Sequence, residues 1–448
     1  MMGEPWHTLI IVALSIGAVV FMVLQLKMQP FLALLIVALA TGLAFGGDPA
    51  SVIAAIKKGT GDALGYVAVV IGLGALLGGM LEASGGVTAI AHRLLAVFGE
   101  KRVPWALLAV GVIVGIPLFF DVAFIILAPL VATLAVRAER RVTYFAIPLL
   151  AGLMAMHALL PPHPGPVAAA ELLHTDYGML AIYGLACGIP AAIIAGPLYA
   201  KYFHSAPGWG DTSPPPMLDE GAPQTRPIGF WFALFSMLVP LALIIIGTVA
   251  DKTMAASSAK SALVFAGHPF VALVVACLMV MIWLRATKGA PLATISSIMT
   301  RALEPAGVMV LIIGAGAAYK EVLIESGAGV QITAVMTAAN ISVIFFAFFL
   351  AAFVRIAQGS ATVAMVTAAG LAAPMVAAAG LTPGQVALVT VAIGAGASIM
   401  SHVNDTGFWL VKQYLGLTEA QTLRSWTICA TIAGLTMLGM ALLLWNFA

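Results

Sequence analysis

The stretch "VPWALLAVGVIVGIPLFFDVAFIILAPLVATLAV", Val103 to Val136, decides how this chain is expected to fold. As one α-helix it would be roughly 50 Å long, whereas the hydrocarbon core of a bilayer is about 30 Å thick. It is also too short for two full crossings and a turn. Basic residues flank both ends, at Lys101–Arg102 and within Arg137–Arg141, and basic flanks favour the cytoplasm. The pattern predicts a re-entrant hairpin with its tip at Gly115–Asp121.

The composition places the chain in a membrane. Of 448 residues, 62% are hydrophobic and only 8% are charged, and the mean hydropathy is +1.09. A soluble domain carries about 25% charged residues, so we predict an all-α polytopic membrane protein. The net charge of +2 does not favour a nucleic-acid partner. The three cysteines are scattered singly and are interpreted as small core residues.

Runs of about 20 apolar residues predict membrane-spanning helices. We expect ten of them, near residues 6–26, 29–46, 62–83, 142–174, 177–200, 228–250, 268–284, 304–325, 383–414 and 420–446. Three amphipathic stretches, 49–60, 86–98 and 290–302, are expected at the membrane interface. No cleaved signal peptide is expected, because the N-terminus lacks a basic region and carries Glu4.

The two halves of the chain resemble each other. Residues 71–86 align without gaps on residues 313–328, with seven identities in sixteen positions. We therefore predict two repeats, 1–203 and 228–448, joined by a Pro-rich cytoplasmic linker at 204–227. The second repeat carries its own re-entrant hairpin at 341–380, whose flanks are uncharged.

Counting crossings predicts that the repeats are inverted. Five crossings in each half reverse the orientation of the second copy, an arrangement common in secondary transporters. With both termini periplasmic, fourteen of the twenty Lys and Arg residues fall on the cytoplasmic side, as the positive-inside rule requires. Four fall outside, and Lys320 and Arg355 lie within membrane segments.

Four irregular stretches converge on a predicted centre: "GIPLFFD" (115–121), "HALLPPHPGP" (157–166), "RIAQGSAT" (355–362) and "SHVNDTG" (401–407). Proline and polar residues interrupt helices there, and such backbone is tolerated at membrane depth only inside protein or beside a water-filled cavity. Free N–H groups at half-helix N-termini favour an anionic solute.

Each polar residue at this centre has a structural and a functional interpretation. Asp121 and Ser360 are candidate N-caps or coupling and binding groups. The histidines can be satisfied core residues or ligands, and a deep carboxylate such as Asp405 can carry a proton. Arg355 can hold the hairpin by donating to its carbonyls or can contact substrate. Glu171, Lys320 and Glu321 lie nearer helix ends and are interpreted as interfacial or structurally paired residues.

Five stretches together resemble the bacterial gluconate:proton symporters, the gluconate permease family of the ion transporter superfamily. They are "FLALLIVALATGL", "GLGALLGGMLEASGG", "HALLPPHPGP", "RIAQGSATVAMVTAAG" and "SHVNDTGFWLVKQYLGLTEAQTLRSW". Members often have Glu where this chain has Asp121, and Pro where it has Thr406. The resemblance implies proton-coupled import of gluconate or a related sugar acid across the inner membrane, by a transport domain moving against a scaffold, with a homodimer as the common assembly.

The resulting hypothesis assigns roles to named residues. The substrate contacts are His157, His163, Ser360, Ala361, Thr362, His402 and Asn404, the proton carriers are Asp121 or Asp405, and the accessory residues are Gly359, Arg355 and Lys320. No cofactor is expected, and neither a P-loop nor an H-E-x-x-H motif occurs. The alternatives are a carrier of D-serine or another small carboxylate, a Na⁺-coupled carboxylate symporter, and an intramembrane metallohydrolase.

Overall fold

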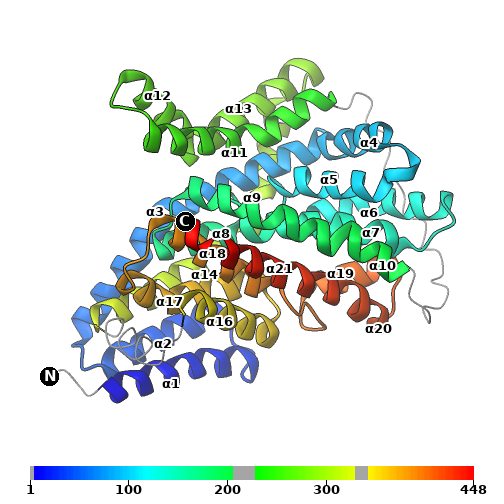
Figure 1. Cartoon of the computed structure of the whole chain (residues 1–448). Coiled ribbons are helices and arrows are strands. Elements are labelled where there is room, and N and C mark those ends of the chain that lie inside the picture. The colour runs from blue at the N-terminus through cyan, green and yellow to red at the C-terminus, as the bar shows by residue number, and fades with distance from the viewer. Residues whose placement is uncertain (1–4, 205–227, 328–341) are drawn as a thin grey trace.

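The computed structural model describes residues 5–204, 228–327 and 342–448, and within these ranges every regular element is helical (Figure 1). Nine helical stretches of the described chain are long and apolar enough to cross a membrane. The predicted all-α polytopic fold is therefore confirmed. The predicted linker lies outside the described residues, apart from its first residue, His204.

The first half contains ten α-helices. They are α1 (Pro5–Leu24), α2 (Pro30–Ala44), α3 (Pro49–Ala83), α4 (Gly86–Phe98), α5 (Val103–Gly115), α6 (Phe120–Arg137), α7 (Val142–Leu159), α8 (Pro164–Leu173), α9 (Tyr177–Ile193) and α10 (Tyr199–His204). A short 3₁₀ turn, Glu100–Arg102, precedes α5, and a π-turn, Ile194–Leu198, joins α9 to α10.

The described part of the second half is also built of helices alone. Its helices are α11 (Phe230–Thr253), α12 (Ser258–Gly267), α13 (Pro269–Lys288), α14 (Leu292–Glu325), α16 (Val343–Gln358), α17 (Ala361–Ala378), α18 (Pro383–Ser398), α19 (Thr406–Leu415), α20 (Glu419–Thr422) and α21 (Ile428–Leu444). A π-turn, Leu423–Thr427, joins α20 to α21. In both halves a long helix, α3 or α14, precedes a pair of helices joined by a short turn, a broken helix and a terminal helix, and in the first half α4 lies between α3 and the pair. The inversion of one copy relative to the other stays a prediction.

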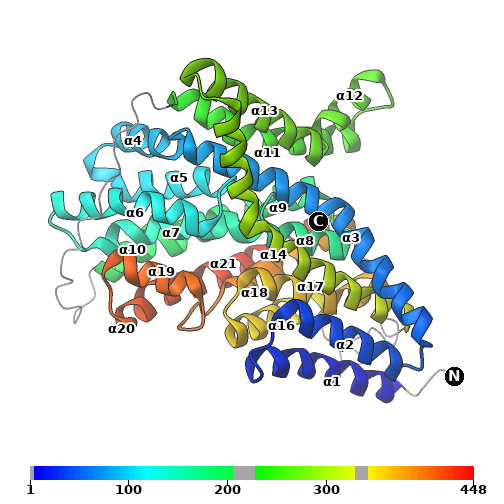
Figure 2. The same ribbon diagram turned by 180° about the vertical axis from the view of Figure 1, so that it is seen from behind.

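The two long helices differ from expectation. Residues 49–60 and 290–302 do not form separate interfacial helices; they continue into the following spans as α3 and α14. The reason is tertiary, because α3 and α14 pack against each other (Figure 2). At Gly59 the approach is so close that a Cβ atom would lie 2.4 Å from the carbonyl oxygen of Ala317. The third amphipathic stretch, 86–98, forms a separate helix, α4.

The segment predicted as the first re-entrant hairpin consists of α5 and α6, joined by residues 116–119. In the second, α16 and α17 are joined by Gly359 and Ser360, while residue 341 lies outside the described ranges. Both turns lie within the stretches that the sequence predicted as tips, and their position at membrane depth stays a prediction. Entry of the two hairpins from opposite membrane faces stays a prediction.

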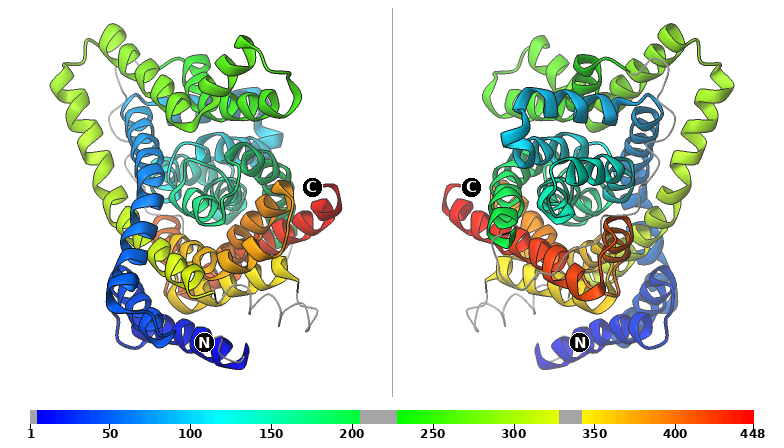
Figure 3. Two further views of the ribbon diagram at one scale, coloured as in Figure 1. Left: turned by 90° about the vertical axis from the view of Figure 1, so that its left-hand side faces the viewer. Right: turned by 90° about the vertical axis from the view of Figure 1, so that its right-hand side faces the viewer.

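Two predicted spans are broken helices. Residues 160–163 separate α7 from α8, because Pro161 and Pro162 cannot continue the backbone hydrogen bonds of a helix. Residues 399–405 separate α18 from α19. The first of these broken helices lies in the interior of the molecule: the most apolar window of Val142–Leu173 is 89% buried, against 33% for that of α13. In Figure 3 the blue-green helices of this region lie in the middle, with other helices above, below and beside them.

Candidate functional site

The first tip and the first break meet at a pair of histidines. Nε2 of His163 lies 2.6 Å from the carbonyl oxygen of Gly115, the last residue of α5, and its Nδ1 lies 3.2 Å from Nδ1 of His157. A carbonyl can only accept, so Nε2 of His163 carries a hydrogen. With both rings neutral, His157 then donates from Nδ1, which leaves its Nε2 as an acceptor. His163 is buried and His157 is partly exposed, so the pair presents an acceptor beside the first tip.

Removing the His163 ring tests its structural role. In His163→Phe the buried Gly115 carbonyl loses its donor, and we expect the free energy of unfolding to fall by about 1–3 kcal/mol. His157→Phe keeps that bond and is expected to destabilise less. The measurement is the melting temperature of both variants in detergent; equal shifts would contradict the assignment.

The second tip and the second break meet at a buried ion pair. The Arg355 guanidinium, at the end of α16, donates to the Asp405 carboxylate and to the carbonyl oxygen of Gly359. Arg355 is 5% exposed and Asp405 is 7% exposed. Among the described residues, Nε of Arg355 is a buried donor with no hydrogen-bond partner. The arginine therefore holds the hairpin tip, as one interpretation of the sequence had it, and keeps one donor unused.

Asp405 is held on several sides. Its carboxylate also accepts a hydrogen bond from the Ser401 hydroxyl and one, at 3.0 Å, from the backbone N–H of Gly407. Through the second bond Asp405 caps the N-terminus of α19. Ser401 in turn accepts from the indole N–H of Trp426 at 2.6 Å, and its carbonyl accepts from Thr427. These three supporting residues were not predicted. Ser401 lay within a highlighted stretch, but nothing in the sequence distinguished Trp426 or Thr427.

The second tip is docked onto the second break through backbone atoms. His402 Nε2 lies 2.9 Å from the Ile356 carbonyl oxygen, and the Asn404 side-chain amide donates to the same oxygen at 2.8 Å. Gly359 has a φ of +87°, and a Cβ atom there would lie 2.1 Å from the Asn404 carbonyl oxygen. His402 and Asn404 therefore bind the C-terminal end of α16, which fixes where the tip lies.

The N-termini of α6 and α17 differ in how they are capped. Ser360 caps α17, since its hydroxyl accepts from the Val363 N–H at 3.4 Å. Asp121 is not a cap: Phe119 occupies the N-cap of α6, and Asp121 lies exposed in the first turn. The first turn of α17, with Ala361 and Thr362, is partly exposed.

Contacts between the halves bring the two clusters together. Phe120 of α6 stacks on Trp426 with ring centroids 5.2 Å apart. At the same place a Cβ atom on Gly407, next to the second break, would lie 3.5 Å from Cε1 of Phe120. The structure thus gathers eleven of the twelve predicted site residues around two tips and two breaks.

Lys320 is the exception. It is 7% exposed in α14, and its Nζ lies 3.1 Å from Nε2 of His174, which follows the far end of α8. The ten-residue helix α8 separates this contact from His163 by about 15 Å. Its neighbour Glu321 forms an ion pair with Lys58, so the structural interpretation of Glu321 is confirmed. Lys320 belongs to this second polar cluster.

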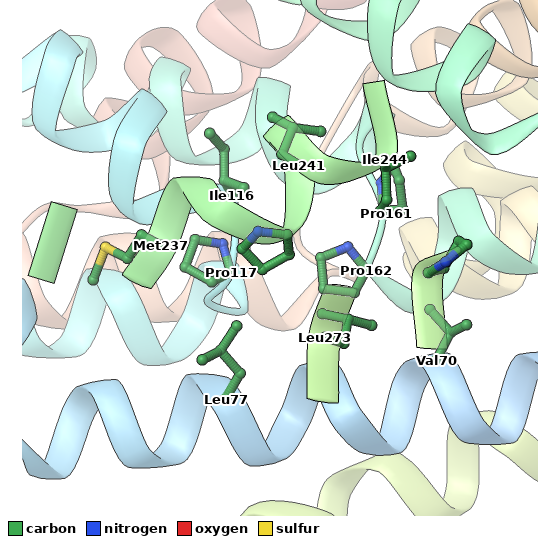
Figure 4. Close-up of a pocket in the computed structure, with 12 residues that line it drawn as sticks. Val70, Leu77, Ile116, Pro117, Pro161, Pro162, Met237, Leu241, Ile244 and Leu273 are labelled. Atoms are coloured by element: carbon green, nitrogen blue, oxygen red, sulfur yellow. The ribbon is translucent and has the colours of Figure 1, made fainter. Parts of the chain in front are cut away.

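The face of the first tip and the first break that packs against α3, α11 and α13 is apolar. Ile116, Pro117, Pro161 and Pro162 face α3, α11 and α13 across a gap of about 10 Å³ lined by apolar side chains (Figure 4). This gap is too small for a solute.

Buried polar residues at interrupted helices are the arrangement that a solute site in a carrier requires, and comparison with known proteins identifies the family of the chain. The sequence profile of GntP family permeases matches residues 7–448. The chain belongs to the GntP permease family. This permease is 37% identical to the Gnt-II system L-idonate transporter of Escherichia coli, over 95% of the chain and 96% of the relative. It is 38% identical to the E. coli low-affinity gluconate transporter, with the same coverage. It is also 38% identical to a gluconate permease of Pseudomonas aeruginosa, over 99% of the chain and 98% of the relative.

A solved structure supports the fold independently. The permease matches the crystal structure of the Alcanivorax borkumensis YdaH transporter with a TM-score of 0.67, over 94% of this chain and 98% of that one. At 16% identity this likeness concerns the fold alone. Family and relatives are permeases, so the permease is a transporter and not an enzyme.

Proposed function

We propose that the permease imports gluconate or a closely related sugar acid together with protons across the bacterial inner membrane. The names of its relatives support the substrate class. The observation that carries the site is the buried guanidinium of Arg355, whose Nε has no partner among the described residues, beside the N-terminus of α17. A buried donor without a partner is costly, and a bound carboxylate would supply the missing acceptor.

The proposed anion site combines three kinds of donor. Arg355 offers Nε, the first turn of α17 offers the backbone N–H groups of Ala361 and Thr362, and Ser360 and Thr362 offer hydroxyls. Asp405 already balances the charge of Arg355, so the positive end of the α17 dipole adds the attraction that an anion needs. The substrate carboxylate is thus bound at the second tip.

The hydroxyl groups of a sugar acid need acceptors as well as donors. Nε2 of His157 is an acceptor on the partly exposed ring of the histidine pair, and His163 orients that ring through their 3.2 Å contact. His402 and Asn404 use their donors on α16 carbonyls. We assign them to positioning the tip, in place of the direct substrate contact that the sequence suggested.

Of the two candidate proton carriers, Asp121 fits better. The carboxylate of Asp405 is already engaged by Arg355, by Ser401 and by the Gly407 N–H. Asp121 lies exposed in the first turn of α6, at the first tip, so its carboxylate can exchange a proton with water. Substrate and proton can therefore bind between the tips together.

Asp121→Asn is expected to lose accumulation driven by an inward proton gradient while keeping exchange of internal for external gluconate. Exchange needs no net proton movement, so the two assays separate coupling from binding. Both are measured with labelled gluconate in proteoliposomes. Gradient-driven accumulation by Asp121→Asn at the wild-type level would contradict the role, and Ser360→Ala, which should weaken both activities, serves as the control.

The same assay decides between the remaining proposals. A sodium gradient that drives uptake at constant pH would favour a Na⁺-coupled carrier, and uptake of D-serine in preference to gluconate would change the substrate. We further propose that both termini are periplasmic, that the repeats are inverted, and that two copies form a homodimer. Reporter fusions at each terminus test the location of the termini and, together with the charge pattern, the inversion of the repeats. The mass of the detergent-solubilised protein tests the homodimer.

A further inference from the structure

A cavity of about 350 Å³ lies between α3, α14 and the first hairpin, separate from the residues assigned so far. Its walls are Gly74, Ala75, Gly78, Gly79, Glu82 and Ala83 of α3, Pro117, Leu118, Phe119 and Val122 of the hairpin, and Ile298, Arg301 and Ala302 of α14. This volume falls within the range of about 300–1,000 Å³ usual for small-molecule sites.

The inner end of the cavity reaches the proposed substrate site. Phe119 lines the cavity, and its ring lies 6.5 Å from the ring of His157 and 6.1 Å from that of His163 between centroids. One aromatic side chain on the first tip therefore stands between the cavity and the histidine pair. Rotation of this side chain, or a small shift of the tip, would open the cavity toward the histidine pair.

The glycines of α3 fix how closely the walls approach. A Cβ atom on Gly74 would lie 2.8 Å from Cβ of Pro162, and one on Gly78 would lie 3.2 Å from the carbonyl oxygen of Pro117. One on Gly79 would lie 2.6 Å from Cβ of Ala302. The glycine face of α3 thus lies against the first tip, the first break and α14 at once.

The outer end of the cavity carries both of its charges. Glu82 lies in the last turn of α3, and Arg301 precedes Ala302, which packs on Gly79. Both side chains are exposed, and Arg301 donates to the Ser297 hydroxyl at 3.1 Å. The mouth also adjoins the point at which the chain returns from residues 205–227, because the Ile228 N–H donates to the Ser84 carbonyl oxygen at 3.3 Å.

We propose that this cavity is the path by which the sugar acid passes between the site and the cytoplasm, and that Arg301 is its anion-binding residue at the mouth. The inference rests on the proposed function for the identity of the solute and for the side of the membrane. Arg301 attracts the carboxylate, Glu82 accepts from hydroxyl groups and lowers the attraction, and Phe119 separates the path from the site.

Cysteine labelling tests the path directly. Ala302→Cys places a thiol in the cavity wall, and the native cysteines Cys187, Cys277 and Cys429 are buried. We expect a membrane-impermeant thiol reagent to label it in everted vesicles but not in intact cells, and saturating gluconate to slow labelling at least about threefold, while the uncharged polyol mannitol does not. Thr294→Cys, exposed on the same helix outside the cavity, should label at a rate independent of gluconate. Val122→Cys repeats the test from the hairpin side if Ala302→Cys folds poorly.

Charge substitutions at the mouth test the role of Arg301 by the sign of their effects. Arg301→Gln is expected to raise the half-saturation concentration for gluconate exchange at the cytoplasmic face about threefold, the size expected of an exposed charge. Arg301→Lys should stay near wild type, and Glu82→Gln should lower the same constant. Equal weakening by Arg301→Gln and Glu82→Gln would overturn the electrostatic role.

The outcomes separate the two proposals. If wild-type vesicles do not transport gluconate, the proposed substrate fails. If they do transport it, but gluconate leaves labelling of both Ala302→Cys and Val122→Cys unchanged, the path is wrong while the proposed function stands.

Discussion

Replacing Arg355 with methionine is expected to abolish gluconate uptake and to lower the free energy of unfolding by about 3–5 kcal/mol. Asp405 would keep its charge in a buried place without its guanidinium partner, and the Gly359 carbonyl would lose its donor. The substrate would also lose the unused Nε donor. Uptake into proteoliposomes and thermal melting in detergent measure the two losses.

A double variant distinguishes binding from stability. Arg355→Met combined with Asp405→Asn removes both charges, and replacing a whole buried ion pair by groups of similar volume is often neutral for stability. We therefore expect the melting temperature to recover in large part while uptake stays absent. If uptake recovers together with stability, Arg355 is a structural residue and the proposed anion site is wrong. Arg355→Lys, which keeps the charge but not the planar donor set, should retain only a small part of uptake.

Replacing Gly359 with alanine is the second change with a large expected effect. The residue adopts a φ of +87°, which disfavours any side chain, and its new Cβ would meet the Asn404 carbonyl oxygen at 2.1 Å. The strained backbone alone costs about 1–3 kcal/mol, and the second tip must also move away from the second break. A shift of about 1 Å can lower the rate of a well-positioned site by about a hundredfold. We expect uptake to fall by this order.

Gly380→Ala is the matched control for that variant. Gly380 also has a positive φ, +63°, but nothing lies within 4 Å of the position of its Cβ. It therefore pays the conformational penalty without the clash. The comparison is made by initial uptake rates normalised to the amount of protein in the membrane. Similar rates for both variants would show that docking of the tip on Asn404 has no part in transport.

The local interruptions of the fold were predictable because they follow from length and from proline chemistry. A 34-residue apolar run between charged flanks is too long for one crossing and too short for two, and α5 and α6 end and begin within the predicted tip. Pro161 and Pro162 broke the next helix as expected. Gly359 was singled out beside the second tip, and the structure shows that its positive φ requires glycine there.

The partners of the polar residues were not predictable, because they lie far apart in the chain. Arg355 and Asp405 are 50 residues apart, and Lys320 bonds to His174 across 146 residues. The sequence offered Lys320 only as an accessory residue, with pairing near a helix end as the preferred interpretation, and it could not show that the partner is His174 at the far end of α8. Likewise, the sequence did not predict that residues 49–60 continue into the following span as one helix, α3, which packs against α14; whether they lie at the membrane interface stays a prediction.

The sequence by itself determined a helical membrane protein with two pairs of helices joined by short turns and two broken helices. It could do so because hydrocarbon thickness and the missing N–H of proline act on each segment separately. Only the tertiary structure decided which interruptions meet. It joined Gly115 to His163, Arg355 to Asp405, and Phe120 to Trp426. The physical reason is that a buried charge or polar group selects its partner by position in the packed bundle, and that position depends on every helix that surrounds it.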